Sequence, residues 1–178
     1  MKIGFFDLEC SNLDADFGRI LCGCIRDLKT QKTITLSCEG FDSYKSQPWD
    51  DKLLCEAIRN ELEKYDIIVT WYGKLFDVRF LQARLAIHES EELKKIKHID
   101  LYYQAKMKLK FASNRLDNVA RVLKLTEQKT RLDPDIWVKA TAGSLDALEY
   151  VKKHCEADVR VLHGVYNKLK VYIERITK

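Results

Sequence analysis

The chain has 178 residues, and its 31 lysines and arginines against 27 aspartates and glutamates give a formal net charge of +4. Hydrophobic residues make up 46% of it and charged residues 33%, with only 7 glycines and 2 prolines. This composition excludes collagen-like, low-complexity and disordered chains, and it provides enough apolar material for a buried core. The length fits one domain over residues 1–178. So small a positive charge does not by itself indicate a nucleic-acid partner.

The six cysteines are expected to be free thiols, because none of them forms a CxxC pair and no secretory leader is recognisable. The first residues are apolar only until Asp7 and Glu9, unlike the core of a signal peptide. Free thiols indicate a reducing compartment, and we therefore expect a cytoplasmic protein. No apolar stretch approaches the ~20 residues that a membrane-spanning helix needs, so no membrane association is expected.

The first part of the chain is expected to form strands. Residues 2–7, 19–26 and 32–37 are short apolar runs of strand length. The polar residues 27–31 between the second and third runs have the length of a hairpin connection. These features predict an antiparallel meander of three strands.

Helices and strands then alternate. Apolar residues at helical spacing predict an amphipathic helix over residues 51–65. Residues 66–71 are a β-branched apolar run of strand length, and a second helix is expected between Gly73 and residue 88. Residues 96–101 are expected to form a short final strand.

After that strand we expect helices and loops alone. Apolar residues at i, i+3, i+4 and i+7 predict a helix over residues 116–123, with Ser113 or Asn114 as its N-terminal cap. The following segment, which contains Asp133 and Gly143, is expected to be a loop.

A long helix is expected to close the chain. Ser144 is placed to cap it, and its apolar stripe runs from Val151 to Ile176, either continuously or with one break. Three antiparallel strands, then alternating helices and strands, then helices predict an α/β fold with a mixed five-stranded sheet flanked by helices.

Carboxylates occur at two places where the surrounding sequence is that of a strand or its end. Asp7 and Glu9 are two positions apart on the first strand, so their side chains share one face. Two such carboxylates repel each other unless a cation lies between them, although a solvated strand end would account for them equally. Asp77 opens a predicted helix just past the strand over 66–71, where it would also serve as a helix cap.

A further carboxylate, Asp158, lies on the apolar stripe of the last helix, next to Val159. His154 is four residues earlier, so the two side chains share a helical face. A carboxylate that faces a core is costly unless it is paired or binds a metal. Hard oxygen ligands suit Mg²⁺ or Mn²⁺, and no Cys/His cluster has zinc spacing. Four carboxylates can hold two such ions about 3.5–4 Å apart for phosphoryl transfer.

Three sequence motifs contain these residues. Residues 5–20 hold a strand that ends in D-x-E, then a loop and a second strand; residues 69–81 contain F-D at a helix start; residues 154–159 begin with H-x-x-x-D. In this order and spacing they resemble the DEDD-type 3′–5′ exonucleases of the ribonuclease-H-like superfamily, such as the proofreading exonucleases of DNA polymerases. Residues 116–120 look like the helix that many members carry between the second and third motifs. The resemblance covers nearly the whole chain and implies a ribonuclease-H-like fold.

The resemblance also implies a set of site residues. The ligands of two Mg²⁺ or Mn²⁺ ions would be Asp7, Glu9, Asp77 and Asp158. Family members have a tyrosine four residues before the last aspartate or a histidine five residues before it. Here His154 has the tyrosine spacing, and we expect it to act as general base or to orient the attacking water. His163 is a second candidate for this role.

Substrate contacts are expected near the second motif and in a lysine-rich segment. Tyr72 stands where relatives usually have asparagine, and Tyr72 or Trp71 could stack on a base, core packing being the alternative for Trp71. Lys106, Lys108 and Lys110 alternate with apolar residues. An extended segment would put the three ammonium groups on one side, suited to a phosphate backbone, whereas a helix would make them an ordinary solvated face.

The leading hypothesis is a metal-dependent exonuclease that removes 3′-terminal nucleotides from single-stranded DNA or RNA. One alternative is a nucleic-acid-binding module that lost turnover through the changes at His154 and Tyr72. Another is a structure-selective endonuclease on the same fold. The F-D and H-x-x-x-D contexts favour the exonuclease. Arg115 and Arg131, in loop-like regions on the expected side of the site, are further candidates for contacting the substrate.

Overall fold

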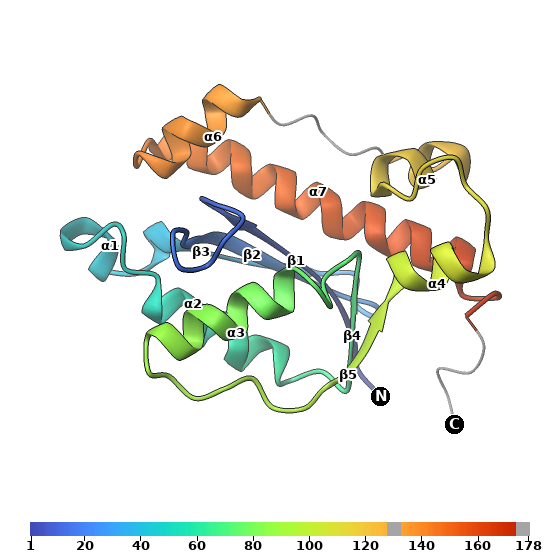
Figure 1. Ribbon diagram of the computed structural model, residues 1–178, viewed down its shortest axis with the longest axis horizontal. Coiled ribbons are helices and arrows are strands. Elements are labelled where there is room, and N and C mark those ends of the chain that lie inside the picture. The colour runs from blue at the N-terminus through green and yellow to red at the C-terminus, as the bar shows by residue number, and fades with distance from the viewer. Residues whose placement is uncertain (128–132, 174–178) are drawn as a thin grey trace.

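One mixed sheet organises the computed structural model, which describes residues 1–127 and 133–173. Its five strands within these residues are β1 (Ile3–Cys10), β2 (Ile20–Asp27), β3 (Thr33–Ser37), β4 (Ile67–Thr70) and β5 (Lys97–Asp100). Their order is β3-β2-β1-β4-β5 (Figure 1). The first three pair antiparallel, whereas β4 runs parallel to β1 and β5 parallel to β4. The predicted fold class, with three antiparallel strands first, is confirmed.

Helices cover both faces of this sheet. They are α1 (Ser43–Ser46), α2 (Lys52–Leu62), α3 (Asp77–Ile87), α4 (Leu101–Lys108), α5 (Leu116–Val122), α6 (Pro134–Thr141) and α7 (Leu145–Leu169), with a short 3₁₀ turn, η1, at Cys38–Gly40. α7 crosses one face, while α2 and α3 lie on the opposite side (Figure 1). Among the described residues, no helix combines the length and the apolar character needed to cross a membrane.

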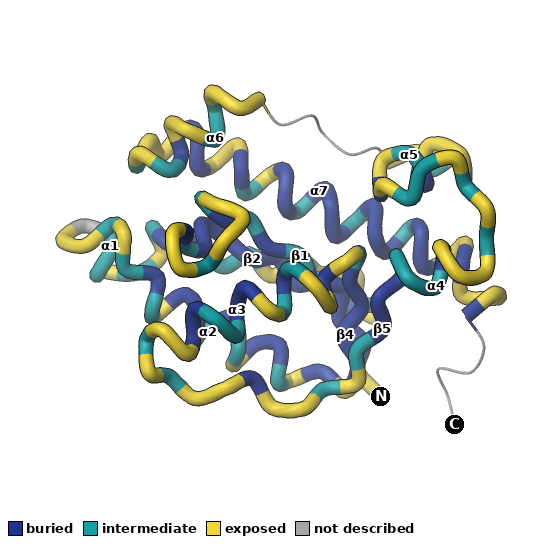
Figure 2. Tube along the Cα trace, viewed as in Figure 1, coloured by how far each residue is buried: buried dark blue, intermediate teal, exposed yellow. Residues whose placement is uncertain are grey.

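Side chains of β1 alternate between these two layers. The ring of Phe5 stacks on His163 of α7, with centroids 4.6 Å apart. Phe6 points to the other face, where Gly23 of β2 lets Ile58 of α2 approach closely; a β-carbon at Gly23 would come within 2.8 Å of the Ile58 side chain. Both β1 and the facing side of α7 are therefore buried (Figure 2).

α7 is continuous, so the option of a broken helix is wrong. Ser144 caps it as predicted, because its hydroxyl accepts the N–H of Ala147 at 3.4 Å. The predicted apolar stripe is buried from Val151 onwards. Ile176, its last predicted member, lies outside the described residues.

The segment expected to be a loop before α7 contains α6. Its start is stabilised by Asp133, whose carboxylate accepts the N–H of Asp135 at 3.0 Å, with a proline at the first helical position. α5 starts where expected, but Arg115 occupies the N-cap position without a side-chain capping bond. The prediction that Ser113 or Asn114 caps it is wrong, because the Ser113 hydroxyl accepts the N–H of Arg115 instead.

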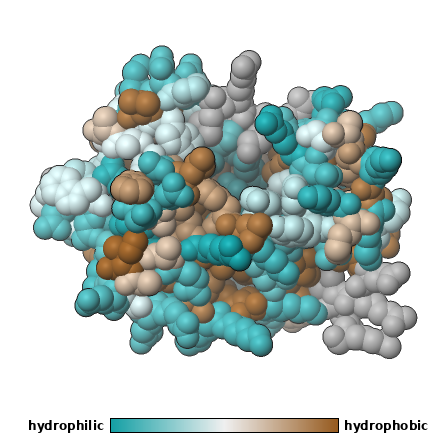
Figure 3. Space-filling model, viewed as in Figure 1, coloured by the Kyte–Doolittle hydropathy of each residue, from teal (hydrophilic) through white to brown (hydrophobic). Residues whose placement is uncertain are grey.

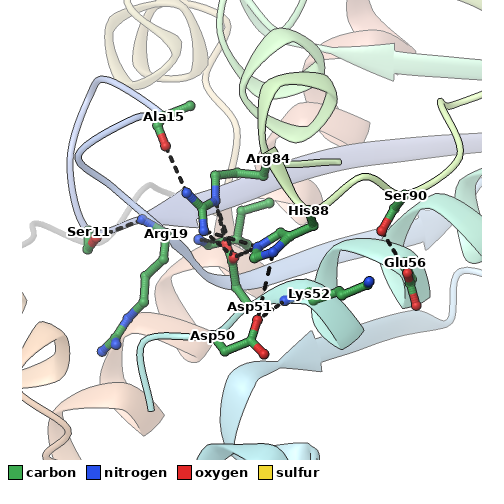
Figure 4. A network of polar contacts seen from close by, with 11 residues as sticks. Ser11, Ala15, Arg19, Asp50, Asp51, Lys52, Glu56, Arg84, His88 and Ser90 are labelled. Atoms are coloured by element: carbon green, nitrogen blue, oxygen red, sulfur yellow. Dashed lines mark hydrogen bonds and ion pairs between the residues drawn. The ribbon is translucent and has the colours of Figure 1, made fainter. Parts of the chain in front are cut away.

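A buried carboxylate, Asp51, ties together four segments of the chain (Figure 4). Its oxygens accept the N–H of Ile20 at 2.7 Å and the guanidinium of Arg84 at 2.6 Å, and Nε2 of His88 lies 2.6 Å away. Arg84 also donates to the carbonyl oxygen of Ala15 at 3.0 Å. The network therefore holds the β1–β2 loop against the start of α2 and against the C-terminal part of α3.

The atoms of Asp51, Cys55 and His88 lie close enough together for a metal ion. However, the guanidinium of Arg84 bonds to both oxygens of Asp51, at 2.6 and 3.1 Å. Burial also raises the pKa of Cys55 well above its ordinary value, so its thiol stays protonated. The cluster is a buried ion pair.

Replacing Asp51 with alanine is expected to lower the free energy of unfolding by about 3–5 kcal/mol, because the buried charge of Arg84 loses its partner. A urea titration followed by circular dichroism measures this change. Lys94→Ala, which removes an exposed pair with Glu63, is the control and should have little effect.

The pH dependence of this difference is a second measurement on the same variant. Burial alone would raise the pKa of Asp51, but the hydrogen bonds from Arg84, Ile20 and His88 outweigh it and hold the pKa below 3.8. The carboxylate therefore contributes its full stability above pH 3.8, and this contribution is lost as the pH falls through the folded-state pKa. The difference in the free energy of unfolding between the wild type and Asp51→Ala should become smaller below pH 3.8. A larger difference at low pH would contradict a lowered pKa for Asp51.

Candidate active site

Asp7 and Glu9 lie inside β1, which continues to Cys10, so the predicted end at residue 7 is too early. The strand is longer because it stays paired with β2, with a shift of register between Glu9 and Cys10. Its parallel pairing with β4 ends at Phe5. Beyond Phe5, the described strands pair with β1 from the β2 side alone. The two carboxylates therefore share a face where the sheet opens.

Asp77 approaches this opening from α3, of which it is the first residue. Its side chain is buried, and its Oδ1 accepts the N–H of Leu8 at 3.1 Å. Leu8 lies between Asp7 and Glu9 along β1. The third carboxylate is thus fixed to the part of the strand that carries the first two.

His154 and Asp158 come from one face of α7 and lie against the same part of β1. Nε2 of His154 is 3.8 Å from Oε1 of Glu9 and 3.7 Å from Oδ2 of Asp158. His154 and Asp158 are each 2% exposed. The three groups are close enough to share a metal ion.

Asp7 contacts Cys155, the residue of α7 that follows His154. The thiol of Cys155 donates to Oδ2 of Asp7 at 3.5 Å. Burial raises the pKa of Cys155 well above its ordinary value, so this sulfur acts as a thiol donor rather than a thiolate ligand. Burial and the charges of Glu9, Asp77 and Asp7 raise the pKa of Cys10 to about 12. Burial is the largest cause of this shift, and the neighbouring carboxylates add to it.

The donor set fits a hard divalent cation. Carboxylate oxygens of Asp7, Glu9 and Asp158 dominate it, as Mg²⁺ and Mn²⁺ prefer, and the imidazole of His154 is also acceptable to Mn²⁺. Carboxylates this close together disfavour each other's ionised form unless a cation compensates them. The predicted site residues are therefore brought together in an arrangement suited to metal binding.

A cavity of about 590 Å³ opens beside Asp7 and Asp158. Its volume falls within the roughly 300–1,000 Å³ range of small-molecule sites. Its walls combine aromatic rings and cationic side chains, among them Trp71, Tyr72, Tyr102, Lys106 and Arg115. The cavity lies at the carboxyl ends of β1, β4 and β5, where the strand order reverses and open α/β sheets bind their ligands.

The turn after β4 presents Tyr72 to this cavity. Tyr72 has a φ of +70°, a backbone conformation that costs a bulky residue about 1–3 kcal/mol. Gly73 has no room for a side chain, because its β-carbon would lie 2.6 Å from Thr70. Asp100, at the end of β5, accepts the N–H groups of Tyr72 at 2.8 Å and Lys74 at 2.9 Å. Asp100 is not among the residues predicted from the sequence, although an acidic residue at the end of an apolar strand was the available signal.

Of the two alternatives for the lysine-rich segment, the helix is correct for Lys106 and Lys108 and the extended segment is not, because residues 101–108 form α4. Asp100 caps this helix by accepting the N–H of Tyr102 at 3.1 Å. Leu101 and Ala105, one turn apart, are buried in the core. Capping and burial at helical spacing outweigh the alternation of lysines with apolar residues.

The three lysines therefore point in different directions. Lys106 lines the cavity, with Nζ 5.6 Å from the ring centre of Tyr102. Lys108 donates to the carbonyl oxygen of Tyr172 at 2.8 Å. Lys110 follows the helix and is exposed.

The remaining predicted residues divide between the cavity and other places. Trp71 lines the cavity and also packs against the core, and its indole donates to the carbonyl oxygen of Asn114 at 3.0 Å. Arg115 lies in the cavity wall. His163 stacks on Phe5 and accepts from Arg26. Arg131 lies outside the described residues.

A second groove, of about 480 Å³, lies between the β1–β2 loop and α3. Leu13, Leu75 and Phe80 are among its lining residues, and apolar side chains gather in this part of the surface in Figure 3. Its described lining includes none of the clustered carboxylates. The first cavity is therefore the candidate active site.

Carboxylates clustered toward the carboxyl end of the central strand of a mixed five-stranded sheet fit a nuclease-type α/β fold. The chain belongs to the RNase H superfamily, whose family model matches residues 4–170. The resemblance to the ribonuclease-H-like superfamily that the motifs predicted is confirmed.

The fold is also that of part of a solved polymerase. The chain is similar to the family B DNA polymerase from the hyperthermophilic archaeon Pyrobaculum calidifontis, with a TM-score of 0.73 and 17% sequence identity. The similarity covers 96% of this chain and 24% of the polymerase chain, and at this identity it shows the fold alone. No curated protein matches the chain at a significant level.

Binding of a divalent cation is expected to stabilise the protein. Mg²⁺ or Mn²⁺ at about a hundred times its dissociation constant should raise the melting temperature by about 5–10 °C, and EDTA should reverse the shift. Asp158→Asn should abolish the shift, whereas Asp146→Asn, an exposed carboxylate on the same helix, should keep it. An unchanged shift in Asp158→Asn would remove Asp158 from the metal site. Thermal scans of the three proteins with and without metal decide this.

Proposed function

We propose that the chain is a single 3′–5′ exonuclease domain, over residues 1–178, that hydrolyses terminal phosphodiesters of single-stranded DNA or RNA. The observation that carries this proposal is the approach of His154 and Asp158 of α7 to Glu9 of β1 beside a cavity with aromatic and cationic walls. The substrate is a single strand with a free 3′ end. Membership of the RNase H superfamily supports a nucleic-acid substrate.

The proposed cofactors are two Mg²⁺ or Mn²⁺ ions, which, when bound, stabilise the negative charge on the attacking and leaving oxygens of phosphoryl transfer. The residues that would hold them are Asp7, Glu9, Asp77 and Asp158. Their carboxylates come from one strand and two helices, so the folded sheet positions them before any ion arrives.

His154 is the proposed general base and accepts a proton from the attacking water at Nε2. The carboxylates of Glu9 and Asp158, at 3.8 and 3.7 Å, stabilise the positive charge that the ring gains. The water oxygen attacks the phosphorus of the terminal phosphodiester, the bond to the 3′ oxygen of the preceding nucleotide breaks, and that oxygen takes up a proton from the solvent to become the new 3′-hydroxyl. The products are a nucleoside 5′-monophosphate and a strand shortened by one residue.

The cavity walls suit the substrate strand. Tyr72 and Trp71 offer rings for base stacking, which tolerates any sequence. Lys106 and Arg115 are placed to contact phosphates, and among the three lysines we assign this role to Lys106. The free state of all six cysteines, each of them described, supports a reducing compartment such as the cytoplasm.

Single-stranded DNA and RNA oligonucleotides with a 5′ label, incubated with Mg²⁺, Mn²⁺ or EDTA, test the activity directly. A metal-dependent ladder that shortens from the 3′ end is expected, and it identifies the preferred sugar. Binding without cleavage would favour a non-catalytic module, and internal cuts would favour an endonuclease. Either result contradicts the proposal.

Two substitutions on α7 separate the roles of the site residues. Asp158→Asn should abolish hydrolysis while the circular dichroism spectrum stays that of the wild type. His154→Ala should lower the rate about 10²–10⁴-fold, as expected for loss of a general base, and leave the metal-induced shift in melting temperature nearly unchanged. Loss of that shift in His154→Ala would make the histidine a ligand or a structural support instead.

A further inference from the structure

Asp100 is a buried carboxylate that serves two segments of the cavity wall. It is 2% exposed and ends β5, two strands away from the carboxylates of β1. Its Oδ1 accepts the N–H of Tyr72 at 2.8 Å and the N–H of Tyr102 at 3.1 Å. Its Oδ2 accepts the N–H of Lys74 at 2.9 Å. One oxygen atom therefore holds the backbone of both tyrosines whose rings line the cavity.

The rings of these tyrosines contact each other. Their centroids are 4.9 Å apart with an interplanar angle of 76°, an edge-to-face arrangement. Trp71 lies 6.3 Å from Tyr102, also edge-to-face, so three aromatic residues of the cavity form one contiguous surface. They come from two segments that are about thirty residues apart in the chain, and the shared oxygen of Asp100 joins these segments.

The backbone of Tyr72 depends on such a support. Its φ of +70° is disfavoured for a bulky residue, and it persists only where the surroundings enforce it. Among the described contacts that hold this conformation, the N–H of Tyr72 donates to Asp100. The carbonyl oxygen of Tyr72 accepts the N–H groups of Leu75 and Phe76. Without the carboxylate, the turn would be free to relax, and the ring of Tyr72 would leave its place beside Tyr102.

We propose that Asp100 is a positioning residue for the substrate strand, acting through Tyr72 and Tyr102 rather than by contact with substrate. It sets the aromatic surface on which the base of the 3′-terminal nucleotide stacks, beside the carboxylates of Asp7 and Asp158. This inference rests on the proposed function for the identity of the ligand. Any base can stack on this aromatic surface, so disrupting the surface should weaken the binding of all sequences to the same extent.

The test compares Asp100→Ala with a matched control, Asp27→Ala. Asp27 is also a buried carboxylate that accepts backbone N–H groups, those of Lys29 and Thr30, but it belongs to the hairpin at the far end of β2. The dissociation constant of a 5′-fluorescein single-stranded oligonucleotide is measured by anisotropy in EDTA, and KM and kcat are measured in Mg²⁺. Thermal scans confirm that both variants fold.

Asp100→Ala is expected to raise the dissociation constant and KM about tenfold, the effect of losing one stacked base, with kcat changed less than about threefold. Asp27→Ala should lower stability but leave the dissociation constant unchanged. The double variant Asp100→Ala/Tyr72→Gly should bind no more weakly than Asp100→Ala, because glycine adopts the positive φ without support and the ring is already misplaced. If Asp100→Ala does not fold, Asp100→Ser, whose hydroxyl can still cap α4 at Tyr102 but does not replace both carboxylate oxygens for Tyr72 and Lys74, should raise the dissociation constant at least threefold.

Three results would overturn the inference: no binding of the oligonucleotide by the wild type, an unchanged dissociation constant in the Asp100 variant, or an equal rise in Asp27→Ala. The binding measurement needs no turnover. If the wild type binds but never hydrolyses the strand, the proposed exonuclease fails, and weaker binding by Asp100→Ala still supports positioning. If the wild type hydrolyses the strand and Asp100→Ala has the same KM, the positioning role of Asp100 is rejected while the proposed exonuclease activity stands.

Discussion

The packing of α7 against β1 is the contact on which the candidate site depends. At one end of the strand Phe5 stacks on His163, and at the other Glu9 meets His154, so the helix runs antiparallel to the strand. The apolar end fixes the register, and the polar positions of the two elements then coincide. A slip of one residue in β1 would turn Asp7 and Glu9 to the opposite face and leave His154 facing apolar side chains. The apolar core thus determines where the carboxylates meet.

Several unfavourable local features lie at this same edge of the sheet. Carboxylate side chains lie close to one another, and the pairing of β1 with β4 ends at Phe5. Tyr72 has a positive φ. None of these would be selected for stability, and each costs free energy that burial elsewhere must offset. Their concentration in one place is typical of a site shaped by binding or catalysis. The Asp51–Arg84 pair differs, because a buried cation compensates that carboxylate.

The sequence was sufficient for the sheet, for α7 and for two pairs of polar residues within one element, because each depends on a periodic pattern. Alternation placed Asp7 and Glu9 on one face, and helical spacing placed His154 with Asp158. The failures concern segments whose structure depends on distant partners. The alternation of Lys106, Lys108 and Lys110 with apolar residues left an extended segment and a helix open, and burial together with the capping carboxylate of Asp100 makes residues 101–108 a helix. That carboxylate also holds Tyr72, 28 residues away, and no local pattern reveals such a pairing.

The open half of β1 lies between two segments that are fixed by buried carboxylates. On one side the β1–β2 loop is held where Asp51 accepts from Ile20 and Arg84 donates to Ala15. On the other side the turn after β4 is held by Asp100. Irregular segments of this kind would otherwise be the most mobile parts of the chain. Because the turn after β4 is bonded to a buried carboxylate, a ligand that enters the cavity would meet Tyr72 already in place, and little ordering of this wall would oppose its binding.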